Sequence, residues 1–131
     1  MSESAILCVD DESVILDSLK EQLKRQFGDR FLYEVAESAV EAWEVIEELQ
    51  EDNIKVIAIV SDWLMPGTKG DEFLIQIHQR FPNLVTVMLT GQADEAAIQR
   101  AKDEANLHAC LYKPWTEQEL TQIITSAIDK P

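Results

Sequence analysis

The chain has 131 residues, of which 25 are acidic and 11 are basic, so its formal net charge is −14 at pH 7. A charge of this sign repels phosphate backbones and anionic membranes, and direct binding to nucleic acid or to a membrane is therefore not expected. The length suits a single domain over residues 1–131. Because the first residues resemble no signal peptide, we expect a cytoplasmic protein.

The first third of the chain alternates between strand-like and helix-like patterns. Residues 5–9 are a short apolar run, and apolar residues then recur at helical spacing until Gly28, which predicts a strand followed by a helix. Residues 31–35 alternate only partly, as is typical of a strand at the edge of a sheet. Ser38 and Glu41 have the spacing of a capping box, which predicts that a second helix begins there.

The middle of the chain contains the two most strongly apolar strands. Residues 56–60 form an unbroken run rich in β-branched residues, which predicts a strand buried on both faces that delivers Asp62 at its carboxyl end. A loop rich in Pro and Gly then leads to a helix, which we expect to end at Pro82. Residues 84–89 predict another buried strand.

The last third is expected to contain two more helices and one strand. Asp94 can cap a helix whose inward positions are mostly Ala, and we expect this helix to be held loosely. Residues 108–112 predict a fifth strand, and Thr116 with Glu119 forms a second capping box. Five strands that alternate with five helices predict an α/β fold with a parallel sheet.

Polar residues follow four of the five predicted strands: Asp10 and Asp11, Asp62, Thr90, and Lys113. The carboxyl ends of parallel strands lie at one edge of a sheet, where ligands bind in such folds. If the three carboxylates converge there, a cation is needed to offset their repulsion, and ligands that are all oxygen favour Mg²⁺. With Lys113 and the Thr90 hydroxyl nearby, this set suits phosphoryl transfer to Asp62. Each residue alone is weak evidence, since an Asp after a strand is often only a helix cap.

These segments together resemble the receiver domain of two-component response regulators over essentially the whole chain. The matching segments are Val9-Asp10-Asp11-Glu12, Ser61-Asp62-Trp63-Leu64-Met65-Pro66-Gly67, Leu89-Thr90-Gly91 and Tyr112-Lys113-Pro114-Trp115. The resemblance implies a flavodoxin-like fold with strand order 2-1-3-4-5. It also implies a signalling switch that catalyses its own phosphorylation and dephosphorylation, with a histidine kinase or phosphotransfer protein as the phosphoryl donor.

The resemblance also assigns roles to single residues. It implies that Asp62 is the phosphoacceptor, that Thr90 carries the switch hydroxyl, and that Lys113 is the invariant-type lysine of the family pattern. The Mg²⁺ ligands would be Asp10, Asp11, Asp62 and the carbonyl oxygen of Leu64. The implied output surface is formed by the fourth helix, the fifth strand and the fifth helix, while the downstream partner and the association of two copies as a homodimer are left open.

Two residues depart from the family's common pattern. Leu64 stands where relatives often have a polar side chain, and it cannot orient a hydrolytic water. Cys110 replaces the usual aromatic switch residue. A flavodoxin-like cofactor-binding or phosphatase module is the alternative, but the loop after the first strand carries Asp10-Asp11-Glu12 in place of a phosphate-binding loop.

The two cysteines, Cys8 and Cys110, lie in the first and fifth predicted strands. In the order 2-1-3-4-5 these strands are separated by three spacings of about 4.8 Å, or roughly 14 Å, whereas a disulfide needs Cα atoms within about 7 Å. We therefore expect both thiols to be free.

Overall fold

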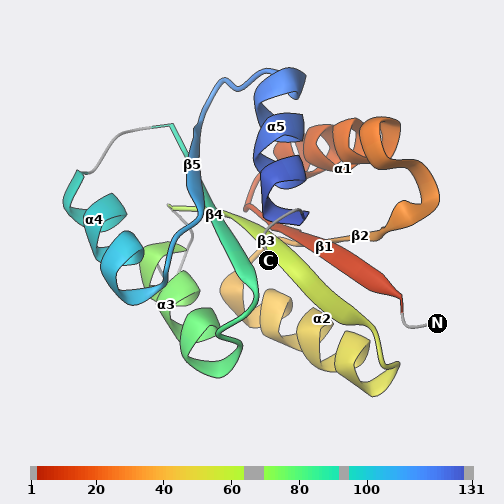
Figure 1. The fold of residues 1–131 in the computed structure, drawn as a ribbon, viewed down its shortest axis with the longest axis horizontal. Coiled ribbons are helices and arrows are strands. Elements are labelled where there is room, and N and C mark those ends of the chain that lie inside the picture. Colours follow the sequence, from red (N-terminus) through yellow and green to blue (C-terminus); the bar gives the residue numbers. More distant parts are fainter. Residues whose placement is uncertain (1–2, 64–69, 92–94, 129–131) are drawn as a thin grey trace.

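The computed structural model describes residues 3–63, 70–91 and 95–128, and it shows a parallel sheet between two layers of helices (Figure 1). The strands are β1 (Ser4–Val9), β2 (Leu32–Ala36), β3 (Lys55–Asp62), β4 (Val85–Thr90) and β5 (Ala109–Tyr112). They are hydrogen-bonded in the order β2-β1-β3-β4-β5, and every neighbouring pair is parallel. The predicted strand order is confirmed.

The helices are α1 (Ser13–Phe27), α2 (Ala39–Glu51), α3 (Gly70–Arg80), α4 (Glu95–Glu104) and α5 (Glu117–Ile128), with a short 3-10 turn at Gly28–Arg30 that was not predicted. Helices α1 and α5 cover one face of the sheet, and α2, α3 and α4 cover the other (Figure 1). This is the flavodoxin-like arrangement. Within the part of the chain that the structure describes, no helix has the length and apolar character needed to cross a membrane.

The edge strand β2 begins one residue later than the sequence indicated, at Leu32. Phe31, which was assigned to this strand, packs edge-on against Phe27 at the end of α1, with ring centroids 5.9 Å apart. The far end of β2 gains Ala36, which pairs in register with Val9 of β1. Ala36 also contributes to the site, because its carbonyl oxygen accepts a hydrogen bond from the N–H of Asp10, the residue that follows β1.

The two predicted capping boxes form to different extents. At α5 both halves are present, since the Glu119 N–H donates to Thr116 Oγ1 at 3.1 Å and the Thr116 N–H donates to Glu119 Oε1 at 3.2 Å. At α2 the Glu41 N–H donates to Ser38 Oγ at 3.1 Å, but the Glu41 carboxylate accepts from the N–H of Glu37 instead of Ser38. The expected cap at Asp94 lies outside the described residues.

Helix α4 buries little apolar volume, as its sequence suggested. Its buried residues are Ala97, Ile98 and Ala101, and two of these three have only a methyl side chain. The buried area of a methyl group contributes little hydrophobic stabilisation at about 25 cal/mol per Å². The packing of α4 is therefore consistent with a helix that is held loosely.

Both cysteines are free thiols, as the strand order predicted. Cys8 is 1% exposed, and burial raises the pKa of its thiol to about 12. Cys110 is half-buried, and burial is also the largest cause of its raised pKa. Because thiolate is the reactive form, we expect iodoacetamide to label native Cys110 faster than Cys8 and both equally after unfolding. Mass mapping of the labelled peptides would check this, and equal native rates would contradict the burial of Cys8.

Candidate functional site

The acidic loop after β1 is held by backbone hydrogen bonds on both sides of Asp10. The Asp10 N–H donates to the Ala36 carbonyl oxygen of β2 at 3.1 Å, and Asp10 Oδ1 accepts from the Glu12 N–H at 2.8 Å. The side chain of Asp10 is fully buried, whereas Asp11 is exposed. The loop thus fixes one carboxylate inside the fold and leaves the next facing solvent.

Asp62 is the last residue of β3, the middle strand of the sheet, and it pairs in register with Leu89 of β4. The N–H of the next residue, Trp63, donates to the Leu89 carbonyl oxygen at 2.9 Å, so the pairing with β4 extends one residue past Asp62. Asp62 is only 6% exposed. The sheet brings it to the acidic loop, and carboxylate oxygens of Asp10, Asp11 and Asp62 all lie within 4.8 Å of one another.

Lys113 joins the two buried acids. Its Nζ donates to Asp10 Oδ2 at 3.0 Å and to Asp62 Oδ1 at 3.3 Å, while its N–H donates to the Thr90 carbonyl oxygen at 2.8 Å. The lysine side chain is 19% exposed. Three strand ends, those of β1, β3 and β5, therefore meet at one ammonium group.

The site holds more negative charge than Lys113 compensates. Burial raises the pKa of Asp62, and the neighbouring Asp10 raises it further, although Lys113 acts in the opposite direction. For Lys113 the largest single effect is burial, which lowers the pKa, but Asp10 and Asp62 together outweigh it and the pKa is raised. The ionised state of Asp62 is thus electrostatically unfavourable without a further cation.

The three carboxylates fit a small divalent cation by their chemistry and spacing. Oxygens on one octahedral Mg²⁺ are about 3.0 Å apart when adjacent and about 4.2 Å apart when opposite, since each lies about 2.1 Å from the ion. The observed spacing, within 4.8 Å, needs only a small contraction. Lys113 contacts Asp62 Oδ1, so the other oxygen of that carboxylate is left for a second partner.

The two remaining predicted site residues have different outcomes. Thr90 ends β4, pairs in register with Tyr112 and is 2% exposed, which places it at the same sheet edge as Asp62. Leu64 lies outside the described residues, so its carbonyl is not placed. The structure thus brings together Asp10, Asp11, Asp62 and Lys113, and puts Thr90 on the neighbouring strand.

Sequence reasoning missed the contacts that hold the loop after Lys113. Trp115 Nε1 donates to Gln22 Oε1 of α1 at 2.8 Å. Two residues later, Glu117 accepts hydrogen bonds from Arg25 and Gln26, also of α1, and the Arg25 Nη2 to Glu117 Oε1 distance is 2.7 Å. These pairs are more than ninety residues apart in sequence, and local patterns carry no signal for them.

The family model of the response regulator receiver domain matches residues 6–125. The chain belongs to this family. Its receiver fold is similar to the signal receiver domain of an HD domain-containing protein from Pseudomonas fluorescens Pf-5, with a TM-score of 0.85, 28% identity and coverage of 98% of this chain and 89% of that one. It is similar to a response regulator receiver domain protein from Clostridium thermocellum, with a TM-score of 0.82, 30% identity and coverage of 96% and 94%.

A curated relative shows the same relationship at the sequence level. The receiver is 31% identical over 127 residues to the hydrogenase transcriptional regulatory protein HoxA of Cupriavidus necator. The match covers 97% of this chain and 24% of that protein. The receiver therefore spans about a quarter of the length of the first curated relatives it matches.

Proposed function

We propose that this receiver domain accepts a phosphoryl group on Asp62 and uses it to switch a protein-binding surface. The observation that carries the proposal is the contact of Lys113 Nζ with both Asp10 and Asp62, beside the acidic cluster that also includes Asp11. In support of the proposal, the Asp62 carboxylate contacts the Lys113 ammonium and lies beside the carboxylates of Asp10 and Asp11. Phosphoryl transfer requires this combination, because the enzyme must position the nucleophile and offset charge on the phosphoryl oxygens.

In the proposed reaction a carboxylate oxygen of Asp62 attacks phosphorus. The new bond joins this oxygen to phosphorus, and the bond from phosphorus to the donor breaks, with its electron pair leaving on the donor. The ammonium group of Lys113 stays beside Asp62 Oδ1 and offsets charge on the transferred group. Mg²⁺, when bound by Asp10, Asp11, Asp62 and the Leu64 carbonyl, would supply further neutralisation of the phosphoryl oxygens.

The phosphoryl donor in this proposal is a phosphohistidine of a histidine kinase or phosphotransfer protein. Family membership supports this choice, since a receiver is the partner on which two-component kinases act. The chain is also similar to a sensor kinase, CckA of Brucella abortus, with 26% identity over 98% of this chain. We include in this proposal a cognate histidine kinase and the association of two receivers as a homodimer.

A small-molecule donor tests the proposal directly. Incubation with acetyl phosphate and Mg²⁺ should add the mass of one phosphoryl group to the intact protein, and chelation of Mg²⁺ should prevent the addition. Peptide mapping after reduction with borohydride should place the modification on Asp62. Modification at another residue, or equal uptake without the metal, would contradict the proposed site.

The output step is expected to involve β5 and α4, because Cys110 replaces the usual aromatic residue. Tyr112 projects from the same side of β5 as Cys110, and its side chain is 49% exposed. A movement of Thr90 toward the phosphoryl group could therefore act through Tyr112 or directly on α4. Structures with and without beryllofluoride should show either a new Tyr112 rotamer or a displaced α4, and no change in either would exclude this face as the output.

A further inference from the structure

A cavity lies at the edge of the sheet opposite Asp62. It has a volume of about 310 Å³ and is bounded by the C-terminal half of α2, the start of β3 and the segment that precedes β4. Its floor is apolar, since Ile46, Val56 and Leu84 are each less than a tenth exposed. Val56 is six residues from Asp62 along β3, or roughly 20 Å at about 3.3 Å per residue. The cavity is thus separate from the phosphorylation site, and its volume is close to the lower limit of small-ligand pockets, about 300 Å³.

The polar groups of this cavity are cations and amides. Lys55 and Arg80 line it, together with the side chains of Gln50 and Asn83, and no acidic residue is among the described residues of its lining. Within the described residues neither Lys55 nor Arg80 has a carboxylate within ion-pair distance. The chain has only 11 basic residues against 25 acidic ones. Two cations at one cavity, with no carboxylate partner in the described part of the chain, are therefore unusual for this acidic protein.

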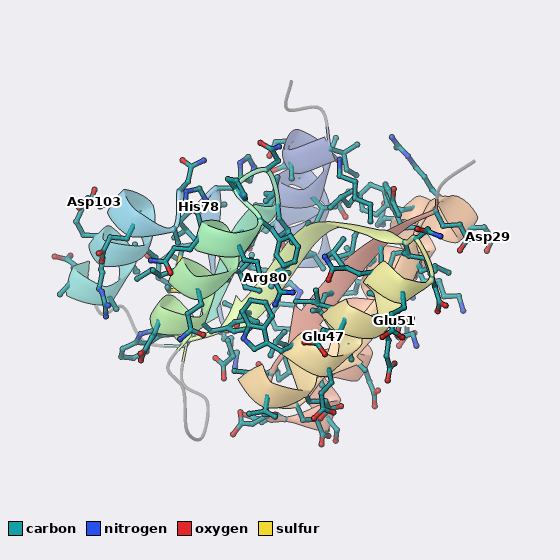
Figure 2. The ribbon with its side chains drawn as sticks, turned by 90° about the horizontal axis from the view of Figure 1, so that it is seen from below. Asp29, Glu47, Glu51, His78, Arg80 and Asp103 are labelled. Carbon is teal, nitrogen blue, oxygen red and sulfur yellow. The ribbon has the colours of Figure 1, made fainter. Side chains whose placement is uncertain are left out.

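Two aromatic rings lie next to the exposed Arg80 guanidinium. Its central carbon lies 5.5 Å from the ring centroid of Trp43 on α2 and 5.4 Å from that of Phe81. Figure 2 shows Arg80 between α3 and α2, and Arg80 is one of the residues that line the cavity. A guanidinium stacked on rings keeps its N–H edges for in-plane hydrogen bonds, which suit a carboxylate. The stacking also reduces the conformational entropy that Arg80 would lose on binding.

The neighbouring acids restrict the charge of a ligand. Figure 2 shows Glu47 and Glu51 along α2, on the helix that carries Trp43, and Glu47 lies one turn after Trp43. Their charges oppose a phosphate or another multiply charged anion more strongly than a single carboxylate, because repulsion grows with the charge of the ligand. We propose that the cavity binds a small monocarboxylate with a branched apolar body, whose carboxylate contacts Arg80 and Lys55. This inference is independent of the proposed phosphorylation.

N-acetyl-leucine is a suitable probe, because it has one carboxylate and one branched apolar side chain. In an amide NMR titration of the full chain we expect saturable shifts at residues 54–56, 81, 83 and 84, with a Kd on the order of 1 mM. N-acetyl-leucinamide, which lacks the charge, should bind at least about tenfold more weakly. Failure of N-acetyl-leucine to shift these amides, or equal binding of the two probes, would overturn the proposal.

A pair of matched variants assigns the interaction to Arg80. Arg80→Gln should weaken N-acetyl-leucine binding by about tenfold, because it removes the stacked cation. Lys24→Gln makes the same change of net charge on the exposed surface of α1 and should bind as the unmodified protein does. If both variants weaken binding equally, the effect is one of net charge and the proposed site is wrong. The dispersion of each variant's amide spectrum verifies that it is folded.

Discussion

Asp62→Asn is expected to abolish phosphoryl uptake from acetyl phosphate. The substitution keeps the shape of the side chain at the end of β3, but an amide oxygen is not a nucleophile toward phosphorus. Intact mass measurement should show no added phosphoryl group on this variant under conditions that fully phosphorylate the protein without the substitution. Asp17→Asn, which makes the same change on the exposed face of α1, should be phosphorylated normally. If Asp62→Asn takes up phosphate at the same rate as the protein without the substitution, the nucleophile is another residue.

The same variant should be more stable than the unmodified protein when divalent cations are chelated. Burial and Asp10 raise the pKa of Asp62 in the folded state above its ordinary value. Between these two pKa values the folded state binds more protons than the unfolded state, so the free energy of unfolding falls as pH rises through that window. Because asparagine does not titrate, the variant does not lose this part of the free energy of unfolding as pH rises.

Thermal unfolding at two pH values measures the effect. At about pH 7 Asp62→Asn should melt at a higher temperature than the parent protein, and near pH 4 the gain should shrink, since an unperturbed Asp titrates at about 3.9. Mg²⁺ should stabilise the unmodified protein more than the variant, because a ligand stabilises the state that binds it. A gain that is the same at both pH values would indicate a packing effect unrelated to charge.

The sheet and its acidic edge could be predicted because their signals are local. The apolar run before Asp62 has the length and composition of a buried strand, and parallel topology then brings the ends of β1, β3, β4 and β5 to one edge. The order of strands also fixed the distance between Cys8 and Cys110. Residue identity at each strand end was enough to identify the candidate site.

The remaining contacts depend on long-range geometry, which sequence patterns do not encode. Nothing near Trp115 indicates that its indole would bind Gln22, ninety-three residues away. Likewise, the stacking of Arg80 over Trp43 requires the relative placement of α2 and α3. The early start assigned to β2 has a similar cause, because Phe31 fits a strand pattern equally well but packs against Phe27. Propensity is local, and tertiary packing decides such positions.

Lys113→Met should lower stability by removing the only ammonium that contacts the buried carboxylates in the described part of the site. Asp10 is fully buried and Asp62 is 6% exposed, so both would remain charged with no adjacent cation. Removing one partner of a buried ion pair costs about 3 kcal/mol, which for a domain of this size corresponds to a fall in Tm of roughly 10 °C. Mg²⁺ or mild acid should restore part of the loss, because each reduces the uncompensated negative charge.

The same substitution should slow phosphorylation even where the protein is folded. Removing a positioned charge that offsets the transferred group typically costs on the order of 100-fold in rate. Time courses of acetyl phosphate uptake, measured below the melting temperature of the variant and at saturating Mg²⁺, separate this effect from unfolding. Lys102→Met, a matched change on the exposed surface of α4, should alter neither Tm nor rate. If Lys113→Met melts lower but reacts at the unmodified rate, Lys113 serves the stability of the acidic cluster and not the transfer step.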